Sequence, residues 1–280
     1  MKVVIHQVDM DTALTALICG ASAADEIIVT RGEAGPEYLA NPQIVCIEVG
    51  GSGEVDKNNF DHHDPNLNLP PACVQAFEVK GGADELKRLI DYVAAIDVDP
   101  TVLPKFSGEI TLSYIFSGMR LLVKKPRKQL IEGIKIFKKV LLMRLDPFGV
   151  MPEEPEWEEY IKVKKSQKEG IEKAKKDAII FTSKKGLKIG YLETNFIGAP
   201  GALYQLGCHI AIAYNPNFGN PPRPKFTISG NKVRISLLLP ILNKLEPGWG
   251  GPSHGTIIGS PREGTRLRPD EIIRIVKNGL

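Results

Sequence analysis

The chain has 280 residues, of which 42% are hydrophobic and 25% are charged, proportions typical of a folded globular protein. No run approaches the roughly 20 apolar residues that a membrane-spanning helix needs, and the opening MKVVIHQVDMD predicts a first strand rather than a signal peptide. The four cysteines are widely spaced with no CxxC pair, so neither a disulfide framework nor a zinc site is suggested. We therefore expect a cytoplasmic protein with no membrane partner.

The net charge of +3 hides opposite charges in two parts of the chain. Residues 1–100 carry 6 Lys and Arg against 17 Asp and Glu, a balance of −11, and residues 101–280 carry 30 against 16, a balance of +14. Two differently solvated surfaces would account for this asymmetry. The alternative is that the acidic part gathers carboxylates around cations while the basic part attracts an anion.

Short apolar runs alternate with helical patterns over the first 150 residues. The predicted strands are 2–6, 26–30 and 44–49, and the predicted helices are 11–24, 84–95, 109–123 and 128–142. Continuously apolar strands interleaved with helices predict an α/β domain built on a parallel sheet with helices on both faces.

A Pro- and Glu-rich break at 151–155 ends this domain, and a charged helix over 156–176 suits a connector. Further strands are predicted at 187–193, 209–214, 225–229 and 233–238, separated by Gly/Pro-rich turns. The sequence therefore predicts an α/β domain at 1–150, a helical linker at 151–177 and a smaller α+β domain at 178–280.

Metal-capable side chains follow three apolar segments of the first domain. The run VVI leads into His6 and then Asp9 and Asp11, VCI leads into Glu48, and VAAI leads into Asp97. The first two runs are predicted strands, and ligand sites in open parallel sheets lie at the carboxyl ends of the strands. We therefore expect these side chains to converge.

A fourth segment, FDHHD at 60–64, places two adjacent histidines between carboxylates. Each piece has a simpler interpretation: Asp9 and Asp11 as helix N-caps, Glu48 as a turn residue before two glycines. Four such segments in one domain favour a metal site, because burying so many acids without cations is costly. Carboxylates and imidazoles without a thiolate favour manganese.

These segments resemble motifs of the DHH phosphoesterase superfamily, which includes RecJ-type exonucleases, cyclic-dinucleotide phosphodiesterases and manganese-dependent pyrophosphatases. HQVDMD at 6–11 is similar to the first motif, and Asp61-His62-His63 stands as the name motif. IEVGG…NNFDHH is similar to the Myg-type exonuclease branch, and AAID at 94–97 to the fourth motif. GWGGPSHGTIIGSPREGTRL at 248–267 resembles the glycine-glycine-histidine element of the associated substrate domain.

The resemblance implies two divalent ions and a role for each metal-capable residue. It implies that His6 and Asp9 hold one ion, that Asp11, His62 and Asp97 hold the second, and that Glu48 bridges them. His63 would face the scissile phosphate, so His63 and Asp11 are the implied catalytic residues. Position 48 departs from the family's aspartate, and the sequence GGPSH displaces His254 from its place after the glycines.

The C-terminal element predicts a phosphate-binding surface. Gly250 and Gly251 allow close backbone approach to a phosphate, and His254, Arg262 and Arg266 could pair with it, arginine in bidentate geometry. A plain turn and ordinary surface charge are the competing interpretations of the glycines and the arginines.

Together these features predict a manganese-dependent phosphoesterase that hydrolyses phosphodiester bonds of short oligonucleotides or nucleotides through a two-metal activated water. A pyrophosphatase-like phosphoanhydride hydrolase and a nucleotide-binding sensor with a degenerate site are the alternatives. The implied partner is a phosphorylated substrate such as short single-stranded nucleic acid, and a homodimer is one candidate assembly.

Overall fold

The computed structural model describes residues 1–99, 109–252 and 255–280 and divides into two compact units, Met1–Lys164 and Lys165–Leu280. The boundaries predicted at 150 and 177 stay a prediction. Among the described residues, no helix combines the length and the apolar composition needed to cross a bilayer.

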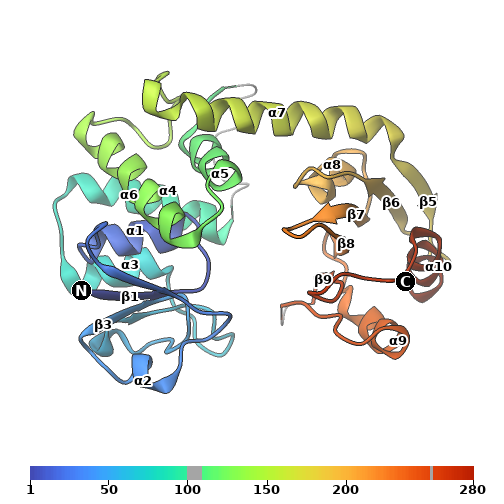
Figure 1. Cartoon of the computed structure of the whole chain (residues 1–280), viewed down its shortest axis with the longest axis horizontal. Coiled ribbons are helices and arrows are strands. Elements are labelled where there is room, and N and C mark those ends of the chain that lie inside the picture. The colour runs from blue at the N-terminus through green and yellow to red at the C-terminus, as the bar shows by residue number, and fades with distance from the viewer. Residues whose placement is uncertain (100–108, 253–254) are drawn as a thin grey trace. The chain divides into compact units, whose positions relative to one another are not determined.

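The first unit is built on a four-stranded parallel sheet in the order β2-β1-β3-β4 (Figure 1). Its strands are β1 (Lys2–Ile5), β2 (Glu26–Val29), β3 (Ile44–Ile47) and β4 (Asn59–Phe60). The parallel sheet expected from the apolar runs is confirmed.

The register of this sheet brings the ends of three strands together. Ile5 of β1 lies opposite Ile47 of β3, which lies opposite Phe60 of β4. The chain therefore leaves all three strands at one edge of the sheet. The residues that follow the strands, beginning with His6, Glu48 and Asp61, start side by side there.

The two faces of the sheet are covered unequally. One face packs into the main core with the larger helices, while the other carries Val4, Ile44 and Cys46 against the segment around the four-residue helix α2 (Pro36–Leu39). The helices of the main core are α1 (Met10–Ile18), α3 (Ala72–Lys80), α4 (Glu85–Val98), α5 (Leu112–Leu122) and α6 (Pro126–Leu142). Alternate side chains of each strand point to opposite faces, so both faces need cover.

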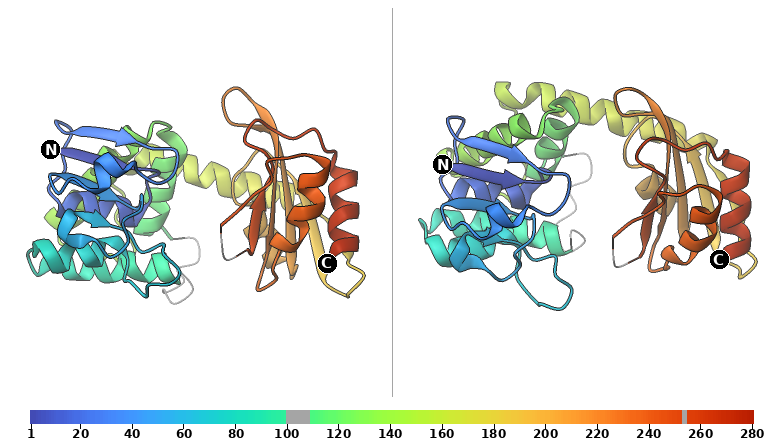
Figure 2. Two further views of the ribbon diagram at one scale, coloured as in Figure 1. Left: turned by 90° about the horizontal axis from the view of Figure 1, so that it is seen from below. Right: turned by 60° about the horizontal axis from the view of Figure 1, so that its bottom comes forward.

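Helix α7 (Glu158–Ala174) begins in the first unit and ends in the second. The second unit has a mixed sheet in the order β5-β6-β7-β8-β9, in which β6 and β7 pair in parallel and the other described pairs are antiparallel (Figure 2). Its strands are β5 (Ile179–Thr182), β6 (Lys188–Glu193), β7 (Ile210–Phe218), β8 (Arg223–Gly230) and β9 (Ile257–Gly259).

Helices lie on both faces of this second sheet. Helix α8 (Ala199–Gln205) covers one face, and α9 (Leu239–Leu245) and α10 (Pro269–Gly279) cover the other. The α+β class expected for this part of the chain is confirmed.

The strand predicted at 233–238 is wrong. Ser236–Leu238 forms a 3₁₀ turn that leads directly into α9. The buried residues here are Ile235, Leu238 and Leu242, a spacing of three and four that belongs to a helix rather than to a strand. Leucine-rich runs fit either pattern over six residues, and only packing against the core decides between them.

Candidate metal centre

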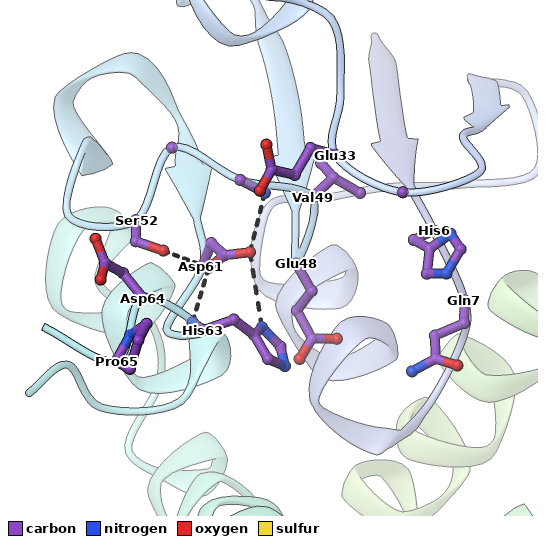
Figure 3. Close-up of a pocket in the computed structure, with 13 residues that line it drawn as sticks. His6, Gln7, Glu33, Glu48, Val49, Ser52, Asp61, His63, Asp64 and Pro65 are labelled. Carbon is purple, nitrogen blue, oxygen red and sulfur yellow. Dashed lines mark hydrogen bonds and ion pairs between the residues drawn. The ribbon is translucent and has the colours of Figure 1, made fainter. Parts of the chain in front are cut away.

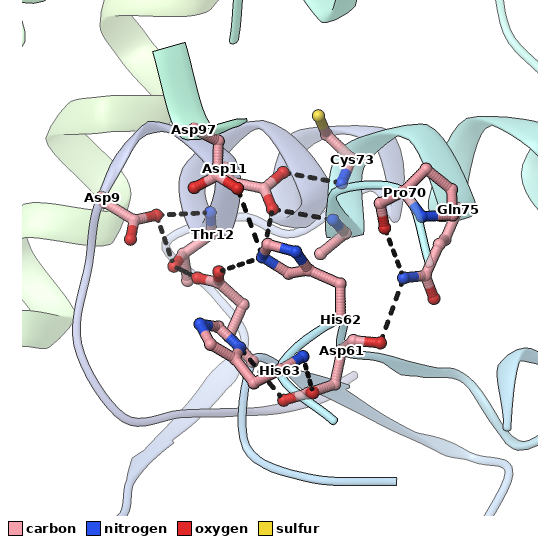
Figure 4. A network of polar contacts seen from close by, with 12 residues as sticks. Asp9, Asp11, Thr12, Asp61, His62, His63, Pro70, Cys73, Gln75 and Asp97 are labelled. Carbon is pink, nitrogen blue, oxygen red and sulfur yellow. Dashed lines mark hydrogen bonds and ion pairs between the residues drawn. The ribbon is translucent and has the colours of Figure 1, made fainter. Parts of the chain in front are cut away.

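Four of the predicted ligands meet at the carboxyl edge of the first sheet (Figure 4). Asp11, Glu48, His62 and Asp97 each offer a ligand atom, and these atoms all lie within 4.8 Å of one another. The Nε2 atom of His62 lies 3.3 Å from Asp97 Oδ2, 3.6 Å from Glu48 Oε1 and 3.9 Å from Asp11 Oδ2. One imidazole nitrogen therefore faces three carboxylates.

Asp11 lies in the first turn of α1 and is 1% exposed. Its two carboxylate oxygens accept hydrogen bonds of 2.7 Å from the backbone N–H groups of Ala72 and Cys73. These N–H groups belong to the first turn of α3, where no intrahelical partner exists. Asp11 thus also caps a helix that begins 61 residues later in the chain.

Glu48 adopts an unusual backbone conformation. Its φ of 52° lies in the left-handed region, which costs a non-glycine residue roughly 1–3 kcal/mol and is concentrated at functional sites. The Glu48 N–H donates to the Phe60 carbonyl at 2.9 Å. The pairing between β3 and β4 therefore extends to Glu48, and the chain turns away only after this residue. Gly51, at a φ of 74°, completes the turn where a Cβ would lie 2.7 Å from the Asn59 amide nitrogen.

The buried Thr12 hydroxyl lies between the carboxylates of Asp9 and Glu48. It lies 2.9 Å from Asp9 Oδ1 and makes a short contact with Glu48 Oε2. The hydroxyl has one proton and both neighbours are carboxylates, so it can donate to only one of them when both are ionised. Thr12 holds the glutamate carboxylate while Glu48 Oε1 faces His62.

Asp61, the first residue of the DHH motif, organises the loop around the cluster. It accepts hydrogen bonds from the Gly50 N–H at 3.0 Å, the His63 N–H at 2.8 Å and the Ser52 hydroxyl. Burial raises the pKa of Asp61, but the hydrogen bonds outweigh it and hold this pKa well below its usual range. Its role is therefore to fix the two segments that carry Glu48 and His62.

His63 faces outward beside this anion, with a side chain that is 64% exposed and an Nδ1 atom 3.7 Å from Asp61 Oδ2. The contact with Asp61 is the main cause that raises the pKa of His63 to about 9. A protonated imidazole there is the kind of group that a phosphate would contact.

The acids of the cluster hold their protons more tightly than usual. Burial raises the pKa of Asp11 to about 6 and that of Glu48 to about 7, and it raises the pKa of Asp97 as well. The Glu48 carboxylate raises the pKa of His62 against the opposing effect of burial. Raised pKa values of this kind show that the buried carboxylates repel one another and that the site would be stabilised by added positive charge.

The residues present fit a divalent metal ion. The buried Nε2 atom of His62 makes no well-formed hydrogen bond to any described residue although three acids surround it. Buried polar nitrogens are rarely left without a hydrogen-bond partner, and coordination of a metal ion would satisfy this one. Oxygen and imidazole donors without a thiolate suit manganese, iron or zinc.

Two predicted ligands, His6 and Asp9, are not members of this four-residue group. His6 is exposed, and its Nδ1 lies 3.0 Å from the Thr30 carbonyl oxygen. Asp9 is the N-cap of α1, where its Oδ1 accepts the Thr12 N–H at 2.9 Å. The half of the site that the resemblance assigns to these two residues stays a prediction.

His6 nevertheless lines the same cavity as Glu48 and His63 (Figure 3). This cavity has a volume of about 510 Å³ and opens beside the cluster. A small phosphorylated ligand would fit in such a space next to the acids.

Sequence reasoning missed Thr12 and helix α3. Thr12 had a local signal, because a hydroxyl residue directly after the aspartates can reach their oxygens from the first turn of a helix. The contacts from α3 had none, because they join residues 61 and 62 positions apart.

The predicted phosphate-binding residues of the second unit have clear structural surroundings. Gly250 forms a β-bridge with Gly259, and a Cβ there would meet no atom within 4 Å. A Cβ on Gly251 would lie 2.1 Å from the Ile257 carbonyl oxygen, so Gly251 serves a close approach of backbones. The Arg262 and Arg266 side chains are exposed, and Arg266 lies 3.9 Å from Glu246. His254 lies outside the described residues.

Neither a family model nor a curated protein sequence matches the chain. Among solved structures, a pGpG-specific phosphodiesterase, PggH from Vibrio cholerae, matches with a TM-score of 0.55 at 14% identity, over 99% of this chain and 96% of that one. The DHH domain of a protein assigned to a family of ribosomal proteins matches with a TM-score of 0.43 at 13% identity, over 98% of this chain and 84% of that one.

The first match covers both units and shows a two-unit α/β fold shared with a phosphodiesterase. At 14% identity, this likeness shows a shared fold. The α/β fold class predicted from the sequence is confirmed.

Proposed function

We propose that this chain is a metal-dependent phosphodiesterase that hydrolyses short oligonucleotides or nucleotides. The observation that supports it most directly is the buried His62 Nε2 atom, which faces three carboxylates without a well-formed hydrogen bond among the described residues. The fold shared with a pGpG-specific phosphodiesterase supports the same reaction class.

Asp11, Glu48, His62 and Asp97 would hold one ion, and His6 and Asp9 would help to hold a second beside Glu48. Manganese is the metal that this donor set favours. Divalent ions bound there would lower the pKa of a water molecule and stabilise negative charge on the phosphoryl oxygens.

The chain's own residues would supply orientation and charge. The bonds from Ala72 and Cys73 hold Asp11 in one rotamer, and Asp61 fixes the backbone that carries both histidines. His63 is exposed at the cavity with a pKa of about 9, so it is protonated at neutral pH. It would contact a non-bridging phosphate oxygen and stabilise the charge that develops there.

The test combines metal analysis with turnover. The purified full chain is expected to retain manganese and to release nucleotides from short RNA or from linear dinucleotides only when the metal is present. Asp97→Asn serves as the matched variant, because it keeps the size of the side chain and removes its charge. Wild-type protein that binds manganese yet cleaves no phosphodiester would contradict the proposal.

A nucleotide-binding sensor is the second candidate. It is favoured by the positions of His6 and Asp9, which lie outside the group of close ligands, and by the glutamate at position 48. Such a protein would bind manganese and a nucleotide without turnover. A phosphoanhydride hydrolase would instead release phosphate from pyrophosphate in the same assay.

A further inference from the structure

A second cavity, of about 420 Å³, lies wholly within the second unit. It opens on the α8 face of the sheet, between the loop that precedes α8 and the strands β7 and β8. Its lining includes the floor residues Ala213 and Thr227, the large apolar residues Phe196, Ile197 and Phe218, and the polar residues Asn215 and Lys225.

The cavity exists because α8 covers only one end of this face. Side chains of a strand alternate between faces, and Ala213 pairs with Thr227 while Asn215 pairs with Lys225. Helix α8 reaches the other end, where the Tyr204 hydroxyl donates to Ser229 Oγ at 2.7 Å. Small residues thus form an open floor beside the first residues of α8, Ala199, Pro200 and Gly201, which also line the cavity.

Large apolar side chains surround that floor and are unusually exposed. Phe196 is 40% exposed, Phe218 47% and Ile197 59%. The Phe196 ring packs directly against Gly170 of α7, where a Cβ would lie only 2.3 Å from the ring. Exposed apolar groups gathered around one hollow indicate a binding site.

Positive charge lies at one corner of the cavity. The Lys225 ammonium donates to the carbonyls of Ser260 and Pro261 at 2.6 Å each. One of its three N–H groups therefore remains to donate to a ligand. Arg262 is close enough to act with burial in lowering the pKa of Lys225, against the raising effect of Glu263. Glu246 raises this pKa as well, so two cations and two acids lie at this corner, and the remaining N–H of Lys225 is the group that would donate to an anion.

We propose that this cavity binds the nucleobase of the phosphorylated substrate, with a phosphate directed toward Lys225 and Arg262. The inference rests on the proposed function for the substrate class and adds the site that would recognise the base. A nucleobase stacks on aromatic rings and presents polar edges, and Phe196, Phe218 and Asn215 match both properties. An acyl chain would use neither the amide nor the cations.

The experiment measures binding of AMP and GMP to the full chain in EDTA, where hydrolysis is absent. Phe218→Ala is expected to weaken binding about 5- to 150-fold, the effect of removing one stacking ring. Ile241→Ala is the matched control, because Ile241 of α9 is also 47% exposed. Arg262→Gln is expected to weaken AMP about 3- to 10-fold and to leave adenosine unchanged, because only the charged contact is lost.

Three results would overturn the inference: neither nucleotide binds, ribose 5-phosphate binds as well as AMP, or Phe218→Ala binds like the control. Its failure is distinguishable from failure of the proposed function. Wild-type protein that binds AMP through Phe218 but cleaves no phosphodiester defeats the hydrolase and supports this site. Cleavage that Phe218→Ala leaves unchanged at every substrate concentration defeats this site and supports the hydrolase.

Discussion

Asp11 and His62 both line the candidate metal centre, yet only Asp11 also carries backbone structure. Two N–H groups of α3 depend on the Asp11 carboxylate, whereas the His62 Nε2 atom supports no described hydrogen bond. Removing the two side chains should therefore have different consequences for folding.

His62→Ala is expected to lower turnover by more than about 100-fold and to lose less free energy of unfolding in EDTA than Asp11→Ala, because it leaves no backbone N–H group unpaired. Asp11→Ala is expected to lose turnover and also about 1–3 kcal/mol for each N–H left unpaired. Chemical denaturation in EDTA, run beside a manganese-dependent assay, measures both effects. Asp11→Asn keeps one acceptor oxygen, so its free energy of unfolding should lie between those of the two alanine variants. Equal stabilities of His62→Ala and Asp11→Ala would contradict the capping role of Asp11.

Thr12 offers a second test at this scale, because its hydroxyl contacts Glu48 Oε2. Thr12→Val keeps the shape and removes the hydroxyl, and we expect manganese affinity to fall roughly 10-fold, as for other groups that orient metal ligands. Thr12→Ser keeps the hydroxyl and should stay close to the wild type. Electron paramagnetic resonance of free manganese measures the affinity.

The control for the Thr12 variants is the substitution Glu48→Asp, which shortens the acidic side chain. In a Glu48→Asp background the carboxylate no longer reaches the same position, so Thr12→Val should cost little more. Additive losses in the double variant, or a Thr12→Ser protein as weak as Thr12→Val, would show that the hydroxyl does not position Glu48.

At the scale of elements, the strands of the first unit were predictable and the helix α3 was not. Continuously apolar runs bounded by polar residues define β1 and β3 without ambiguity, and parallel pairing then brings their ends together. Helix α3 follows two prolines and has a mixed composition, and its first turn is stabilised by Asp11 from far away in the sequence. Such tertiary capping is invisible to local patterns.

The same limit explains the candidate site. Glu48 could be placed at this edge because it follows an apolar strand. His62 lies in a loop and Asp97 lies in the last turn of α4, so the resemblance, and not a strand end, associated these two residues with the site. The surroundings that set their chemistry depend on side-chain positions: the hydroxyl of Thr12, the bonds to Asp61, and the 3.0 Å separation of His6 from the Thr30 carbonyl. No spacing in the sequence encodes those distances.

The junction of α1, β3 and α3 should respond to pH in a defined direction when no metal is bound. The pKa values of Asp11 and Glu48, about 6 and about 7, lie above the ordinary 3.8 and 4.5. Between roughly pH 4 and pH 7 the folded state therefore binds more protons than the unfolded state, so its stability falls as pH rises. His63 acts in the same direction, because its stabilisation is complete below pH 6.5 and is lost as pH rises through about 9.

We therefore expect the EDTA-treated protein to melt at a lower temperature at about pH 7.5 than at about pH 5.5. Saturating manganese should remove this difference or reverse it, because ligands bind the metal in their deprotonated form. Differential scanning fluorimetry at the two pH values measures it. Glu48→Gln removes one of the titrating groups and should flatten the metal-free profile; a wild-type profile that rises with pH would contradict the assignment.

At the scale of the whole molecule, the charge asymmetry follows the two units. Residues 1–164 carry 18 Lys and Arg against 25 Asp and Glu, a balance of −7, and residues 165–280 carry 18 against 8, a balance of +10. Each unit has its own core. The acidic unit holds the candidate metal centre and the basic unit holds the proposed base-binding cavity, which gives both charges a functional meaning.

This division predicts where each ligand should protect the backbone from hydrogen exchange. Manganese should slow exchange at Gly50, Ala72 and Cys73, because ligation fixes the Asp11 carboxylate and the Asp61 loop to which these N–H groups donate. AMP in EDTA should instead slow exchange in 194–201 and 213–227, the segments that line the second cavity. Exchange read by mass spectrometry resolves both regions, with 233–246 around α9 as an internal reference that neither ligand should change. Protection of 194–201 by manganese alone would place a metal site in the basic unit and contradict the separate roles assigned to the two units.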